Sequence, residues 1–206
     1  MILFYSEGRL GNQIFQYAFL KNIAIHNELI VVIDFDDLSN VFELSDKRFL
    51  LIRRFKGSKR LYSTIIKPFL SFLASLRLIT IIRQDFRYSN GYKCSDDSYT
   101  QRKGLLPVKF VENGFFQSER FFSETGTGDL SIKENFINKA LSILNKVPAE
   151  KHKIFVHVRR GDYINESCLG EKGLTLPLKY YKDCIRWLND NLDNPFYVFI
   201  STTAQH

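Results

Sequence analysis

The residue types best suited to bind a charged ligand stand together in the segment His157-Val158-Arg159-Arg160-Gly161-Asp162-Tyr163. An apolar run at 154–156 directly precedes the motif and predicts a short buried strand. Arginine is permanently charged and offers a planar fork of donors that matches phosphate oxygens. Ligands of open α/β sheets bind where strands end. The motif therefore indicates a phosphorylated ligand. The alternative is an ion pair of one arginine with Asp162 and the other arginine in solvent.

A glycine-containing loop near the N-terminus, Gly8-Arg9-Leu10-Gly11-Asn12-Gln13, is the second candidate. Glycines let a backbone approach a ligand, and the N-terminus of a following helix favours negative charge. The spacing differs from the dinucleotide fingerprint Gly-x-Gly-x-x-Gly, so a Rossmann dehydrogenase is not indicated. The alternative is a tight turn in which Asn12 caps the helix.

Acidic and aromatic segments supply two weaker candidates. Asp34-Phe35-Asp36-Asp37 follows a predicted strand and could hold a divalent metal on a nucleotide-sugar diphosphate, although an acidic strand exit is favoured. Gly114-Phe115-Phe116-Gln117-Ser118-Glu119 combines aromatic and amide side chains. Both phenylalanines are predicted to lie in the core. Gln117 and Glu119 are candidates for hydrogen bonds to sugar hydroxyls.

The elements that must position these residues are of the α/β class. A strand at 2–5, a loop at 6–12, a helix at 13–26 and a strand at 29–33 form one βαβ unit. A second unit follows, with strands at 154–158 and 196–200 around a helix that Pro177 opens. Both units predict parallel strand pairs. The segment Val147-Pro148-Ala149-Glu150, which ends the preceding helix, is the best candidate domain boundary and divides the chain into 1–150 and 151–206.

The middle of the chain is less regular. Residues 68–82 are predicted to form a partly buried helix rather than one that lies on an anionic membrane surface. The polar stretch 89–104 is predicted as a loop, and Ser131 with Glu134 as the capping box of the next helix. Basic residues are crowded between 47 and 60, where a solvated helix face is favoured over a phosphate-facing groove.

Composition narrows the class of protein. The 206 residues carry a net charge of +7, which suits an anionic ligand, nucleic acid or an anionic membrane face. Three cysteines without a Cys-x-x-Cys pair indicate reduced thiols in a cytosolic protein. No secretory signal is visible. The basic middle segment keeps open a non-catalytic module that binds polyanions, and Asp34 with Asp36 keeps open a metal-dependent glycosyltransferase of the GT-A type.

Four segments together resemble bacterial α-1,2-fucosyltransferases of glycosyltransferase family 11. The stretch from Gly8 to Ala18 resembles the N-terminal signature of that family, and residues 157–163 resemble its His-x-Arg-Arg-x-Asp motif. Residues 114–119 and 176–181 look like its linking segments. The four occur in the family's order and reach from near the start of the chain to near its end.

The resemblance implies a GT-B fold of two facing Rossmann-like domains, with an acceptor-side domain at 1–150 and a GDP-sugar-binding domain from 151. It implies GDP-fucose as donor, a terminal galactoside as acceptor, inversion at the anomeric carbon and no required metal. Arg159 matches the arginine that contacts the donor pyrophosphate, and Arg160 matches its essential neighbour. His157 and Asp162 complete the motif and fix its loop. Donor-side positions of the N-terminal signature correspond to Arg9, Gly11 and Asn12. The sequence identifies no general base; Asp162 is one candidate, although a structural role is favoured for it.

The chain departs from the family after Phe196-Tyr197-Val198-Phe199. The family usually continues there with Ser-Asp-Asp and further strands, whereas this sequence continues with Ile200-Ser201-Thr202-Thr203. We therefore expect an incomplete second domain and weak or absent activity. The resemblance also implies a role in surface polysaccharide (O-antigen) synthesis and a cytoplasmic location. A lipid-linked acceptor would bring the protein to the inner face of the cytoplasmic membrane, and no nucleic-acid partner is expected.

Overall fold

The computed structural model describes residues 1–206 except 90–91, 123–127, 160, 166, 169–170 and 203–206. The chain forms two compact units, Met1–Phe136 and Ile137–His206. The division between them lies within helix α5 (Glu134–Leu144), whereas the sequence predicts a boundary at residue 150. The assignment of an acceptor-side domain and a donor-binding domain stays a prediction.

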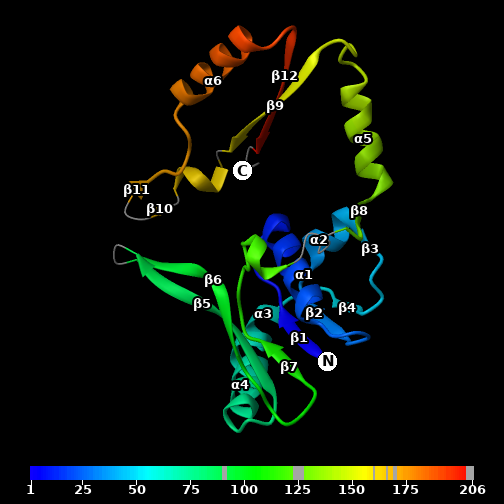
Figure 1. The fold of residues 1–206 in the computed structure, drawn as a ribbon, viewed down its shortest axis with the longest axis vertical. Coiled ribbons are helices and arrows are strands. Elements are labelled where there is room, and N and C mark those ends of the chain that lie inside the picture. Colours follow the sequence, from blue (N-terminus) through cyan, green and yellow to red (C-terminus); the bar gives the residue numbers. More distant parts are fainter. Residues whose placement is uncertain (90–91, 123–127, 160, 166, 169–170, 203–206) are drawn as a thin grey trace. The chain divides into compact units, whose positions relative to one another are not determined.

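The N-terminal unit is built on a six-stranded sheet with the order β4-β2-β1-β7-β5-β6 (Figure 1). All neighbouring strands in it are parallel except the β5–β6 pair. The predicted parallel pair at the start of the chain is confirmed, because β1 and β2 run side by side in register. The strands are β1 (Ile2–Tyr5), β2 (Ile30–Ile33), β4 (Phe49–Ile52), β5 (Thr80–Ser89), β6 (Tyr92–Arg102) and β7 (Lys109–Val111).

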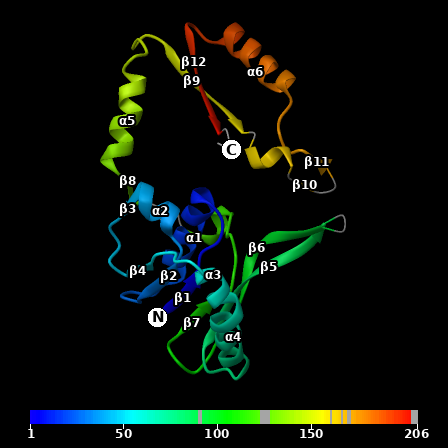
Figure 2. The same ribbon diagram turned by 180° about the vertical axis from the view of Figure 1, so that it is seen from behind.

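Helices cover both faces of this sheet because successive strand residues point to opposite sides. Ile2 and Phe4 of β1 pack in the cluster that contains Phe19 of helix α1 (Leu10–Ile23). Tyr5, on the other face, packs with Tyr62 and with helix α4 (Lys67–Ser75). Helix α3 (Ser58–Leu61) and a π-helical turn η1 (Tyr62–Ile66) lead directly into α4. Figure 2, the view from behind, labels α3 and α4 on the same face of the sheet as Tyr5.

Short elements connect these layers. The first, α2 (Asp36–Val41), begins within the acidic segment after β2, with Asp36 and Asp37 in its first turn. A two-stranded antiparallel pair joins β3 (Phe42–Leu44) to β8 (Leu130–Ile132). A short 3-10 turn, η2 (Glu119–Phe121), ends the aromatic segment.

Two boundaries around the helices differ from the prediction. Helix α1 begins at Leu10 with Arg9 in the N-cap position, so Asn12 lies inside the helix and does not cap it. The predicted helix at 68–82 is wrong in its second half, since α4 ends at Ser75 and β5 begins at Thr80. Arg77 adopts a left-handed φ of 58° and reverses the chain, which frees the following isoleucines to enter the sheet.

The predicted loop at 89–104 is wrong, because most of it is the edge strand β6, paired antiparallel with β5. An edge strand exposed to solvent needs no apolar alternation, so its polar sequence carries little signal of a strand. The predicted capping box is also wrong, because Ser131 lies in β8, opposite Glu43 of β3. The backbone of Ser131 is committed to that ladder, and α5 starts only at Glu134.

The C-terminal unit contains the second predicted βαβ arrangement, which is confirmed. Strand β9 (His152–Arg159) pairs in parallel with β12 (Pro195–Thr202), and helix α6 (Leu178–Asn191) connects them behind Pro177. The unit also contains the 3-10 turn η3 (Gly161–Ile164) and the paired strands β10 (Ser167–Cys168) and β11 (Glu171–Lys172). The final residues 203–206 lie outside the described part of the chain. No helix in the described part is long and apolar enough to span a bilayer.

Candidate functional site

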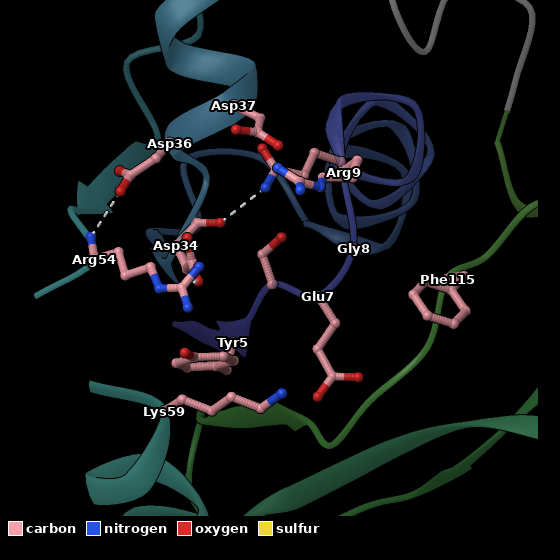
Figure 3. Close-up of a pocket in the computed structure, with 12 residues that line it drawn as sticks. Tyr5, Glu7, Gly8, Arg9, Asp34, Asp36, Asp37, Arg54, Lys59 and Phe115 are labelled. Atoms are coloured by element: carbon pink, nitrogen blue, oxygen red, sulfur yellow. Dashed lines mark hydrogen bonds and ion pairs between the residues drawn. The ribbon is translucent and has the colours of Figure 1, made fainter. Parts of the chain in front are cut away.

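A cavity of about 670 Å³ opens at the carboxyl ends of β1 and β2 (Figure 3). The chain leaves both strands through loops that bear polar side chains, and these loops form its walls. This edge of a parallel sheet is where α/β proteins bind ligands. The lining residues are Tyr5, Ser6, Glu7, Gly8, Arg9, Gln13, Asp34, Asp36, Asp37, Arg54, Lys59 and Phe115.

The turn after β1 depends on Gly8. Its φ is +88°, and a Cβ built on it would lie 2.1 Å from Nδ2 of Asn12. The turn brings Arg9 to the N-cap of α1 and into the cavity wall. Gly11 differs from Gly8, because a Cβ added to it would have no heavy atom within 4 Å. Packing therefore explains the glycine at position 8 but not the one at position 11.

The turn after β2 is held by Gln13 of α1. Its Nε2 donates to the backbone oxygen of Asp34 (3.1 Å), and its Oε1 accepts from the backbone N–H of Leu38 (2.8 Å). Asp34 itself has a φ of 70°, which is uncommon for a residue with a side chain. Such backbone strain is concentrated at functional sites in proteins.

Arg54 connects the acidic loop to the end of β4. Its Nε lies 3.7 Å from Oδ2 of Asp34, and its backbone N–H donates to Oδ2 of Asp36 (3.0 Å). Figure 3 shows Arg54, Asp34 and Tyr5 together on one side of the cavity and Phe115 on the other. Among the described residues, no group of three or more His, Cys, Asp or Glu side chains is arranged to hold a metal ion. The expectation of a metal-independent site stays a prediction.

Burial perturbs two ionisable groups in the cavity. Desolvation raises the pKa of the Asp34 carboxyl, and the charge of Arg54 opposes this only in part. Desolvation also raises the pKa of Tyr5, whose ring stacks on Tyr62 with the centroids 4.3 Å apart. Tyr5 is only 3% exposed, and its hydroxyl, which faces Ser58 and Asp34, makes no well-formed hydrogen bond in the described structure. A bound hydroxyl or water is the natural partner for such a group.

The aromatic segment contributes one residue to the core and one to the cavity. Phe116 is buried and stacks on Phe19 at 3.7 Å, as predicted, but Phe115 is 37% exposed and lines the cavity. Both backbone N–H groups donate to Oε1 of Gln84 (3.0 and 3.1 Å), and the φ of 52° at Phe116 turns the two rings apart. The prediction of a core position for Phe115 is therefore wrong.

The amide of Gln117 bonds within the protein. Its Nε2 donates to Oδ1 of Asn12 at 2.5 Å, which joins the aromatic segment to the glycine-containing loop. The two segments that resemble the family therefore lie in contact. Glu119 lies in the turn η2 and is not among the residues that line the cavity. The sugar contacts predicted for this pair stay a prediction.

The arginine motif lies in the other unit. Strand β9 ends at Arg159, one residue beyond the predicted end, and the prediction that it is buried is wrong, because Phe155 is 55% exposed. His157 is exposed in the same strand, opposite Ile200 of β12. The Arg159 guanidinium lies over the ring of Tyr163, with Cζ 3.7 Å from the ring centroid. Arg160 lies outside the described residues. Asp162 belongs to η3, and its side chain lies outside the described part of the structure. The donor contacts predicted for the motif stay a prediction.

Five cavity residues were not singled out as site residues by the sequence: Tyr5, Ser6, Glu7, Arg54 and Lys59. The last two belong to the basic middle segment, for which a solvated helix face is favoured. The missing signal is the position of β4 beside β2 in the sheet, because it places the residues after Ile52 at the same edge as Asp34. Topology, not residue type, therefore brings these cations to the carboxylates.

The sequence of the chain is similar to proteins of one known family. The model of the family described as glycosyl transferase family 11 matches residues 1–205. An alpha-1,2-colitosyltransferase from Escherichia coli is 29% identical, and the match covers 93% of this chain and 66% of that relative. The chain thus spans just under two thirds of the relative's length. No solved structure matches the chain. A parallel α/β sheet with a polar cavity at its carboxyl edge suits a Rossmann-like glycosyltransferase, and the match over nearly the whole chain shows that the protein belongs to glycosyl transferase family 11.

Proposed function

We propose that the protein transfers L-fucose from GDP-fucose to the 2-hydroxyl of a terminal galactoside, with inversion at the anomeric carbon. The acceptor is a precursor of a surface polysaccharide, and the two units correspond to the two domains of a GT-B enzyme. The observation that carries the proposal is the family match over residues 1–205. The α-1,2 linkage named for the E. coli relative supports the same regiochemistry.

The cavity of the N-terminal unit is the acceptor site in this proposal. Its volume of about 670 Å³ lies within the range of about 300–1,000 Å³ that is typical of small-molecule sites. Carboxylates, cations and an amide alternate around it, so a sugar can exchange hydrogen bonds with both donors and acceptors. The exposed face of Phe115 offers an apolar surface for a sugar ring.

Asp34 is the carboxylate that we propose as the proton acceptor for the attacking hydroxyl. Its desolvated position raises its pKa, which makes it a better base than an exposed aspartate. Gln13 holds its backbone, so the carboxylate is oriented before the acceptor binds. Arg54 lies close enough to keep it ionised at neutral pH.

The arginine motif binds the departing nucleotide in this proposal. Cleavage of the glycosidic bond places negative charge on GDP, and a positioned cation stabilises that charge more in the transition state than in the ground state. Arg159 and Arg160 fill this role, while His157 and Asp162 fix their loop. Arg9, Gly11 and Asn12 belong to the donor side as well. The two arginines make a metal ion unnecessary.

The relative's name favours a second candidate for the donor sugar. The E. coli protein is a colitosyltransferase, so the corresponding GDP-colitose is the competing donor. Both candidates share the nucleotide, the linkage and the proposed roles of Arg159 and Asp34. Parallel assays with the two donors separate them directly.

Nucleotide and acceptor binding test the proposal in separate steps. GDP should raise the melting temperature of the purified chain, and UDP should not. Arg159→Ala should abolish the shift, whereas Asp190→Asn, an exposed change in the same unit, should leave it intact. In saturation-transfer NMR, lactose should receive signal from the wild type and much less from Asp34→Asn. A melt that responds to neither nucleotide, or lactose binding that ignores Asp34→Asn, would contradict the proposal.

A further inference from the structure

The helical segment from Ser58 to Leu76 is apolar on two faces, and only one of them is buried. Tyr62, Leu70 and Ala74 pack against the sheet. The other face presents a stripe at helical spacing whose side chains are 39–60% exposed: Leu61, Ile65, Phe69, Phe72 and Leu76. We name these five residues the outer stripe. A contiguous exposed apolar stripe of this kind marks an interaction surface.

The charged residues of the sequence segment that carries the outer stripe all have one sign. Residues 47–84 contain ten Lys and Arg and no Asp or Glu. Of the 29 basic and 22 acidic residues of the chain, this leaves 19 basic and 22 acidic residues elsewhere. The whole positive net charge of the protein therefore resides in the segment that carries the stripe.

The basic residues border the stripe at both ends. Arg60 directly precedes Leu61, and Arg77 directly follows Leu76; both are exposed. Leu105, 83% exposed, joins the second end, because its backbone N–H donates to the carbonyl of Arg77 at 2.9 Å. Other cations of the segment are paired with acids from elsewhere, such as Arg48 with Asp46 and Arg83 with Glu112. Those at the ends of the stripe face solvent.

We propose that the outer stripe and its flanking arginines dock the protein onto the surface of an anionic lipid bilayer. Phenylalanine and leucine on one helix face, bordered by basic residues, fit a helix that lies in the interface of a membrane. A positive segment without carboxylates is attracted to anionic headgroups and would be poorly matched to a second copy of itself.

The docking face adjoins the cavity. Lys59 lines the cavity and a neighbouring depression, which contains the cations Arg54, Lys56 and Arg60 and one carboxylate, Asp36. Arg60 in turn precedes the outer stripe, so the route from cavity to bilayer is short and positively charged. A lipid-linked acceptor with a phosphate next to its sugar would match this order. That last step rests on the proposed function, whereas docking itself does not.

Flotation of the full chain with vesicles tests docking without any sugar or nucleotide. Vesicles of phosphatidylglycerol and phosphatidylethanolamine should bind the wild type, and vesicles of phosphatidylcholine alone should bind it at least tenfold less. Phe69→Ser combined with Leu76→Ser should weaken binding to the anionic vesicles at least tenfold. Arg60→Gln combined with Arg77→Gln should weaken it roughly thirtyfold at low salt. The matched control is Phe136→Ser combined with Leu141→Ser, an equal loss of exposed side chains on α5, and it should bind like the wild type.

The substituted side chains are exposed, so all variants should fold. Thermal melts of each variant check this. Equal loss of binding in the stripe variant and the α5 control would overturn the proposal, as would indifference to lipid charge. Light scattering identifies the competing occupant: a wild-type dimer that the stripe variant converts to monomer, without vesicle binding, would assign the face to a second copy. The GDP-induced shift in melting temperature is measured separately, so failure of docking and failure of the proposed function remain distinguishable.

Discussion

The two glycines of the N-terminal loop should respond in opposite ways to the same substitution. Gly8→Ala places a methyl group at a left-handed φ of +88° and 2.1 Å from Nδ2 of Asn12. Asn12 must then move, which breaks its hydrogen bond with Gln117. Gly11→Ala adds a methyl group in open space within the first turn of α1, at a φ that alanine adopts without strain.

The sizes of the two effects follow from these contacts. For Gly8→Ala, a left-handed conformation costs about 1 kcal/mol and a lost hydrogen bond about 1 kcal/mol more. The sum of about 2 kcal/mol should lower the melting temperature by roughly 4–8 °C for a chain of this size. For Gly11→Ala, helix propensity stabilises by about 0.5–1 kcal/mol, which should raise the melting temperature by roughly 1–4 °C.

Thermal and urea unfolding of the two variants provide the assay, and GDP binding adds the functional readout. Gly11→Ala should be the more stable protein and should still bind GDP more weakly, because the proposed donor role of this glycine requires close approach of the ligand to its backbone. A melting temperature that falls in Gly11→Ala, or one that is unchanged in Gly8→Ala, would refute the structural reasoning. Wild-type GDP affinity in Gly11→Ala would refute the donor role.

Three further substitutions follow from the buried contacts. Burial raises the pKa of Asp34, so its ionised form destabilises the fold above that pKa. Asp34→Asn should therefore raise the melting temperature at pH 7, lose this gain below pH 3.8, and abolish transfer. A lower melting temperature at pH 7 would contradict this. Desolvation of the Asp129 carboxyl is outweighed by hydrogen bonds from Lys21 (2.7 Å) and Tyr17 (2.5 Å), so the pKa of Asp129 is lowered. Asp129→Asn should therefore destabilise the protein at pH 7, and much less as the pH falls below 3.8. A difference in urea unfolding that does not change with pH would count against this. Phe116→Ala should cost about 3–5 kcal/mol in urea unfolding, because the ring is fully buried in the aromatic cluster, and a loss below about 1 kcal/mol would show that the cluster is not packed as described.

Sequence patterns predict the apolar strands of both units, because a run such as Ile30–Ile33 favours the interior of a parallel sheet. Burial does not follow in the C-terminal unit, where Phe155 of β9 is 55% exposed and Phe199 of β12 is 60% exposed. The same rule fails for β6, since an edge strand can be polar throughout. It also fails for Ser131, where a strand pair with β3 outcompetes a helix cap. Local patterns describe what a residue prefers, and tertiary pairing decides which preference prevails.

Some residues of the candidate site could be predicted from the sequence, and others could not. The glycine-containing loop and the acidic exit from β2 could be located from the sequence, because each directly follows a predictable strand. Arg54 and Phe115 could not, since their place in the cavity depends on strand order and on a single positive φ at Phe116. A buried tyrosine hydroxyl without a well-formed hydrogen bond, as at Tyr5, has no signature in sequence at all.

The most direct test of the proposed transfer is the structure of its product. The purified chain is incubated with GDP-fucose and lactose, in parallel with 2′-deoxylactose, and the products are analysed by NMR. The account predicts that any product, formed slowly in keeping with the weak activity expected of this chain, carries a fucosyl group in α linkage on the 2-hydroxyl of galactose, and that the deoxy acceptor gives no product. Fucosylation of another hydroxyl of lactose, or transfer to the 2′-deoxy acceptor, would contradict it.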